Sequence, residues 1–182
     1  MNEPQSPNTV APLQANPAPS ALPSSPASIL PAVIRLRKIL TPVDFSEASK
    51  KALKYALAFA QQFQASLHLL HVVEFATVGS EFGAVELSRM IEDMQANAQQ
   101  HLAQWVKEEI GGRVPSEALI RTGRPYAEII TTAQELEIDL IIIASHGHSS
   151  LAHVLLGSTV ERVVRQGLCP VLVVRPQGHE FV

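Results

Sequence analysis

The chain has 182 residues, of which 46% are hydrophobic and 17% charged, and its formal net charge is −3. This length and apolar content suit a single globular domain, while the lack of a long basic run argues against nucleic-acid binding. No uninterrupted apolar run of about 18 residues occurs, so we expect no membrane span. A single cysteine and no basic N-terminal region lead us to expect a cytoplasmic protein.

Residues 1–33 differ in composition from the rest of the chain. They hold eight of the 13 prolines and one charged residue, Glu3. Proline fixes φ and removes a backbone donor, and the segment has too few large apolar side chains to offset the entropy of ordering. We predict a disordered tail over residues 1–33 and one domain over residues 34–182. A start of translation further along the chain is an alternative explanation of the segment.

From Arg35 onward, apolar strand patterns alternate with helical patterns. Ser46 suits a helix N-cap, because its hydroxyl accepts a free backbone N–H, and Pro125 suits a first helical turn. The run Leu140–Ala144 is apolar on both faces, which is typical of an inner parallel strand. Strands are expected at 37–42, 66–74, 116–123, 139–145 and 170–174, and helices at 47–63, 87–110, 125–136 and 158–165.

This alternation predicts the α/β class, with one doubly wound domain and helices on both faces of its sheet. In such sheets a ligand lies beyond the carboxyl ends of the strands, where the strand order reverses. Small residues end the fourth strand at Ala144 to Gly147, and Gly157-Ser158-Thr159 then begins a helix. Because unpaired N–H groups and the positive end of the dipole gather at a helix start, we predict an anion cradle there.

Other strand ends complete a nucleotide-shaped site. Asp44 follows the first strand and could accept hydrogen bonds from a ribose, and Val72 near the end of the second could cover a base. Between Leu140 and Val160 the chain has no Lys, Arg, Asp or Glu, so the cradle would hold phosphate through its backbone. Asp44 could instead only cap the next helix, and the glycines could serve only a tight turn. Arg124 could reach phosphate or remain in solvent.

The chain resembles the universal stress protein family from Arg35 to Arg175, in the segments ILTPVDFSEASKKAL, LHLLHVV, TGRPYAEI and ASHGHSSLAHVLLGSTVERVVRQGLCPVLVVR. Nucleotide-binding members carry Gly, two residues, Gly, nine residues, then Gly with Ser or Thr. Here the second Gly is Gly147 and the last pair is Gly157-Ser158, whereas Ala144 replaces the first Gly. Its methyl group could be tolerated if the backbone is not left-handed, or it could narrow the slot.

The resemblance implies a five-stranded parallel sheet, a homodimer formed through the last strand, and binding of ATP or AMP with Mg²⁺ as an accompanying ion. By the same resemblance, the implied binding residues are Pro42, Val43, Asp44, Val72, Ala144, Gly147, Gly157, Ser158 and Thr159. The implied role is that of a regulatory stress-response protein rather than an enzyme.

Two other functions stay open at this stage. One is a slow ATPase, although the chain lacks a Walker-type lysine and we predict no catalytic residue. The other is a dimeric interaction module that binds no nucleotide. We predict no metal site at His146, His148 and His153, because no Cys, Asp or Glu accompanies them, and we expect Cys169 to be a buried small residue.

Overall fold

The computed structural model describes residues 34–74, 84–147, 156–177, 180 and 182. The predicted tail, residues 1–33, and two of the three histidines considered as metal ligands, His148 and His153, lie outside these residues. The elements are β1 (Lys38–Pro42), α1 (Glu47–Phe63), β2 (Ser66–Val73), α2 (Ala84–Trp105), η1 (Val106–Ile110, a π-helix), β3 (Ser116–Thr122), α3 (Pro125–Glu135), β4 (Leu140–Ala144), α4 (Ser158–Gln166) and β5 (Val171–Val174).

The five strands form one sheet in the order β3-β2-β1-β4-β5, and all neighbouring strands are parallel. In the sheet, β2 and β3 lie on one side of β1, and β4 and β5 lie on the other side. The strand order therefore reverses between β1 and β4, which places the switch point there. The predicted α/β class and five-stranded parallel sheet are confirmed.

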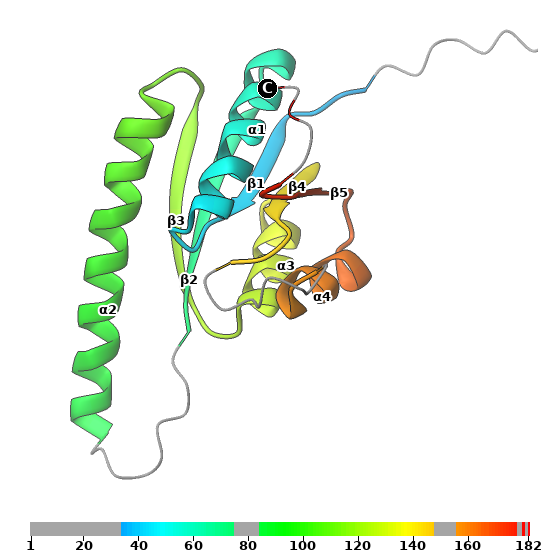
Figure 1. The fold of residues 1–182 in the computed structure, drawn as a ribbon. Coiled ribbons are helices and arrows are strands. Elements are labelled where there is room, and N and C mark those ends of the chain that lie inside the picture. Colours follow the sequence, from blue (N-terminus) through cyan, green and yellow to red (C-terminus); the bar gives the residue numbers. More distant parts are fainter. Residues whose placement is uncertain (1–33, 75–83, 148–155, 178–179, 181) are drawn as a thin grey trace, which may run out of the picture. The chain divides into compact units, whose positions relative to one another are not determined.

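Helices cover both faces of this sheet, α1 and α2 on one and α3 and α4 on the other (Figure 1). Successive side chains of a strand point to opposite faces of the sheet, so alternate residues of each strand pack in two separate hydrophobic cores. In β4, Ile142 and Ala144 belong to the core under α1, whereas Ile141 and Ile143 belong to the core under α3 and α4. Burial on both faces explains why β4 reads as a continuous apolar run.

The apolar residues that recur at helical spacing along α2 are buried only near its C-terminal end. Ala98 and Leu102 are buried, but Leu87, Ile91 and Met94 are only partly covered. A helix of this length extends about 33 Å at 1.5 Å per residue, whereas β3 extends about 23 Å at 3.3 Å per residue. The helix is therefore longer than the strand it packs on. Within the described residues, no helix is long and apolar enough to cross a membrane.

Candidate functional site

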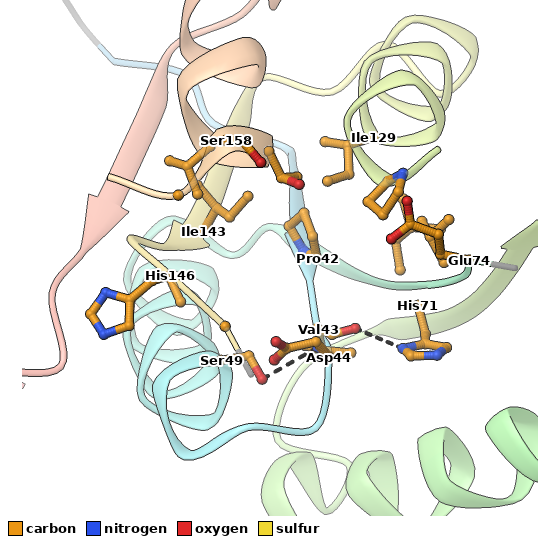
Figure 2. Close-up of a pocket in the computed structure, with 18 residues that line it drawn as sticks. Pro42, Val43, Asp44, Ser49, His71, Glu74, Ile129, Ile143, His146 and Ser158 are labelled. Carbon is orange, nitrogen blue, oxygen red and sulfur yellow. Dashed lines mark hydrogen bonds between the residues drawn. The ribbon is translucent and has the colours of Figure 1, made fainter. Parts of the chain in front are cut away.

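A cavity of about 480 Å³ lies at the carboxyl ends of β1, β2 and β4, at the switch point of the sheet. Its wall combines apolar side chains with carboxylates, hydroxyls and two imidazoles (Figure 2). All nine residues implied by the sequence lie in this wall. The apolar lining includes Pro42, Leu70, Val72, Ile129, Ile143 and Val160, and the polar lining includes Asp44, Ser49, His71, Glu74, Ser158 and Thr159.

Asp44 is fixed in the turn between β1 and α1. Its Oδ1 accepts hydrogen bonds from the backbone N of Ser46 at 3.1 Å and from the Ser46 hydroxyl at 2.5 Å. Ser46 also caps α1 as predicted, because its Oγ accepts the N–H of Ser49 at 3.2 Å. The carboxylate thus supports the helix start and lines the cavity at once. The two sequence-based interpretations of Asp44, helix capping and ligand contact, are therefore compatible.

The Asp44 carboxylate packs so closely against Gly147 that there is no room for a side chain at this position. A Cβ built on Gly147 would overlap Asp44 Oδ2 and would lie 3.0 Å from Asp44 Cγ. Its φ is not in the left-handed region, so the requirement comes from close approach rather than from backbone conformation. The loop after β4 and the turn after β1 therefore meet at this pair of residues.

The start of α4 is tied back to the end of β4. Gly157 N donates to Ser145 O at 2.8 Å, and Ser145 N donates to Val174 O at 2.8 Å. Gly157 is the N-cap residue, and among the described residues no side chain makes a capping hydrogen bond to this helix. The first N–H groups of a helix lack intrahelical acceptors, so those of α4 are suited to an anion in the adjacent cavity.

Gly157 differs from Gly147 in what a side chain would meet. A Cβ at Gly157 would lie 3.4 Å from Ser145 O, an ordinary contact, and the N-cap φ of −69° is open to any residue. Among the described residues, neither packing nor backbone conformation requires a glycine here. Because Gly157 lies in the cavity wall, close approach of a ligand to its backbone is one reason for a glycine at this position.

Ala144, where the family pattern has glycine, keeps an extended strand conformation. The residue is 5% exposed and belongs to the core under α1, on the opposite face of β4 from Ile143. Since alternation points its Cβ toward α1, the methyl group is accommodated in that core. The geometry favours tolerance of the alanine over narrowing of the slot.

Several residues of the wall were missed by the sequence analysis. His71 and Glu74 come from β2 and the residue after it, and Pro125 and Ile129 come from α3. Only the order β2-β1-β4 reveals that these residues share a cavity with Asp44 and Ser158. No pattern local to β2 or α3 carries that information.

His71 is held by two contacts from the β1–α1 turn. Its Nδ1 lies 2.8 Å from Val43 O, and its ring packs against the Phe45 ring with centroids 4.4 Å apart and planes tilted by 31°. The pKa of His71 is lowered, because the effect of burial is larger than the opposing effects of the Val43 carbonyl and Asp44. The imidazole is therefore favoured in its neutral form.

Other candidates lie outside the site or make local contacts. Arg124 is exposed and does not line the cavity. The guanidinium of Arg124 lowers the pKa of Tyr126. His146 does line the cavity, and its Nδ1 lies 3.0 Å from Ser145 Oγ. Within the described part of the chain, no group of three His, Cys, Asp or Glu side chains could hold a metal ion.

Cys169 packs partly buried against the core under α3 and α4. Burial raises the pKa of its thiol, which favours the protonated and unreactive form. The sequence predicts a buried Cys169, whereas the residue is only partly buried, although it does pack against the core.

Comparisons with known proteins agree with this architecture. The universal stress protein MJ0577 of Methanocaldococcus jannaschii is 31% identical over 158 residues, covering 78% of this chain and 96% of that protein. Universal stress protein YxiE of Bacillus subtilis is 33% identical, covering 76% of this chain and 98% of that protein. The solved structure of UspA from Lactobacillus plantarum, 32% identical, aligns with a TM-score of 0.69 over 79% of this chain and all of that one. A sequence model of the universal stress protein family matches residues 35–175, and the chain belongs to this family.

Proposed function

We propose that the cavity binds an adenine nucleotide, ATP or AMP, and that the protein is a cytoplasmic regulatory homodimer rather than an enzyme. The observation that carries the proposal is the order of chemical groups along the sheet edge. The start of α4, which no described side chain caps, follows β4, Asp44 follows β1, and Val72 and Glu74 lie at the end of β2. Phosphate, ribose and base would lie over these groups in that order.

The dimensions of the sheet suit this arrangement. Neighbouring strands are about 4.8 Å apart, so β4 and β2, with β1 between them, are separated by roughly 10 Å. This is the scale of a mononucleotide laid across the strand ends. The apolar wall from Leu70, Val72 and Ile129 would cover a flat base, and the Asp44 carboxylate would accept from ribose hydroxyls.

Energetics require both ends of the site. Helix N-terminal contacts contribute about 0.3–2 kcal/mol per anionic group, whereas micromolar affinity corresponds to about 8 kcal/mol. An aromatic ring system that buries about 200 Å² contributes roughly 5 kcal/mol. The phosphate cradle alone would therefore bind weakly, and the apolar slot would supply most of the affinity. Mg²⁺ would be held chiefly by the nucleotide's own phosphates.

Two more distant solved structures of the same fold contain adenine nucleotides. A universal stress protein 21% identical to this chain was solved with cAMP, and one from Archaeoglobus fulgidus, 17% identical, with dAMP. Those ligands belong to those proteins, and the likeness at this level of identity concerns the fold. The position of Ala144 in the core under α1 argues against the alternative that the chain is a nucleotide-free module with a closed slot.

The edge strand β5 supports the proposed homodimer. It pairs with β4, and Val171, Leu172 and Val173 are only partly buried. Nearby, Leu168 is 81% exposed and Val164 is 49% exposed. An apolar edge strand invites pairing with another strand, and a second copy of β5 would cover it. Sedimentation equilibrium should give twice the chain mass, and a monomer at micromolar concentration would contradict this part of the proposal.

Retained and added nucleotide test the binding proposal. Denaturing extraction of the purified protein followed by mass spectrometry should release adenine nucleotide, and calorimetry should show ATP binding. Asp44→Ala should weaken ATP binding about tenfold or more, because a charged hydrogen-bonding partner of the ribose is lost. Asp93→Ala, the same change at an exposed position of α2, should leave the affinity unchanged. No retained nucleotide and no heat at millimolar ATP would contradict the proposal.

We also assign this function to the domain of residues 34–182 without the preceding tail. The family match begins at residue 35, and the described residues of the cavity wall lie within the domain. A chain that starts at Ile34 should bind ATP with the affinity of the full chain in the same calorimetric titration. A marked loss of affinity would show that residues 1–33 take part in binding.

A further inference from the structure

We propose that His71 is a positioning residue for the nucleotide site, which acts by holding the turn that presents Asp44. This inference rests on the proposed function and concerns the same cavity. The turn comprises residues 43–46 between β1 and α1.

The turn is held next to β2 by successive contacts. Val43 N donates to Leu70 O at 2.8 Å, which continues the pairing of β1 with β2. The next carbonyl, Val43 O, lies 2.8 Å from His71 Nδ1. Because a carbonyl oxygen only accepts, the hydrogen of the neutral ring must be on Nδ1. That bond fixes the orientation of the peptide group that joins Val43 to Asp44.

Phe45, which follows Asp44 in the turn, adopts an unusual backbone conformation. Phe45 has a φ of 64°, a left-handed conformation that side-chain-bearing residues seldom adopt. The surrounding contacts must therefore hold it. Its ring packs at a tilt against His71, with centroids 4.4 Å apart, and meets Trp105 edge-on, with centroids 5.4 Å apart.

His71 therefore contacts the residues on both sides of Asp44. It holds Val43 by a hydrogen bond and Phe45 by a tilted ring contact, while the Asp44 carboxylate is fixed by Ser46 and lies against Gly147. In Figure 2 the dashed line from His71 reaches Val43 directly beside Asp44. Loss of the Nδ1–H donor would free the Val43 carbonyl and allow the carboxylate to leave its place under the ribose.

Two substitutions separate the donor from the ring. In His71→Asn the amide nitrogen is attached to Cγ, as Nδ1 is in histidine, so a donor to Val43 O is retained without the ring. In His71→Phe the flat ring is retained against Phe45 without any donor. Calorimetric titration of full-length protein with ATP should show about tenfold weaker binding for His71→Phe and a change within about threefold for His71→Asn. If His71 only stabilised the fold, the loss of ATP affinity in each variant would instead be proportional to its loss of unfolding free energy in urea.

The outcomes distinguish this inference from the proposed function. Wild-type affinity in His71→Phe, or equal losses in both variants, would overturn the role of His71 while ATP binding by the wild type stands. A wild-type chain that binds no ATP would overturn both. If His71→Phe does not fold, ¹⁵N NMR of the wild-type histidines decides the question. We expect the His71 hydrogen on Nδ1, and a hydrogen on Nε2 would overturn the inference.

Discussion

Replacement of Gly147 by alanine tests the contact that joins the two halves of the site. The added Cβ would overlap Asp44 Oδ2, although the backbone conformation at Gly147 is open to alanine. The carboxylate must then move and weaken its bonds from Ser46 N and Oγ, now 3.1 and 2.5 Å long. A hydrogen bond to a charged group contributes about 1.5–3 kcal/mol. We therefore expect a loss of about 2 kcal/mol, which lowers Tm by about 4–8 °C in a domain of this size.

Thermal unfolding of a double-mutant cycle gives the decisive comparison. In an Asp44→Ala background the carboxylate is absent, so Gly147→Ala should cost less than about 0.5 kcal/mol. Gly157→Ala is the matched control: its Cβ would make an ordinary 3.4 Å contact with Ser145 O, so whatever it costs as the N-cap of α4 should be the same with and without Asp44. An equal cost of Gly147→Ala with and without Asp44 would refute the explanation. All proteins should be compared at one concentration.

Three further changes have expected outcomes that follow from the structure. Because the folded-state pKa of His71 lies below its ordinary value of 6.5, the unfolded chain binds the proton first and stability falls as pH drops below about 6.5. Urea unfolding at pH 7.5 and 5.5 should show this loss, and an identical pH dependence in His71→Asn would count against it. Ala144→Gly removes a buried methyl group from β4 and should destabilise the fold by about 1 kcal/mol; ATP binding that occurs only in this variant would show that the natural alanine closes the slot. Gln64 ends α1 with a φ of 54°, a left-handed conformation that glycine adopts without strain. Gln64→Gly should therefore raise the free energy of unfolding in urea by about 1 kcal/mol, and a lower free energy of unfolding would contradict the left-handed cap.

Much of the fold could be predicted because its determinants are local. The Ser46 cap, Pro125 at a first helical turn and the apolar run of β4 each act within a few residues. The residues that line the cavity could be named for a related reason, since the parallel strands of such a sheet bring their carboxyl ends to one edge. Residues as distant in sequence as Asp44 and Ser158 are thereby expected at the same place.

The remaining features depend on which strands are neighbours. His71 reads as one more residue of an apolar strand until β2 is known to lie beside β1, and Gly147 meets Asp44 only because β4 lies on the other side. The partial exposure of Leu87 and Ile91 follows from the relative lengths of α2 and β3. The sequence pattern of one element carries no information about the length of the element it packs on. The left-handed conformation of Phe45 likewise depends on rings from β2 and α2.

An NMR titration with ATP tests the central claim most directly, because it reports where the nucleotide binds as well as whether it binds. We predict that the largest shifts of backbone amide resonances occur at Asp44, Gly147, Gly157, Ser158 and Thr159, around the switch point between β1 and β4. Saturation should follow a single binding curve. Amide shifts concentrated away from these residues, or none at millimolar ATP, would contradict the account.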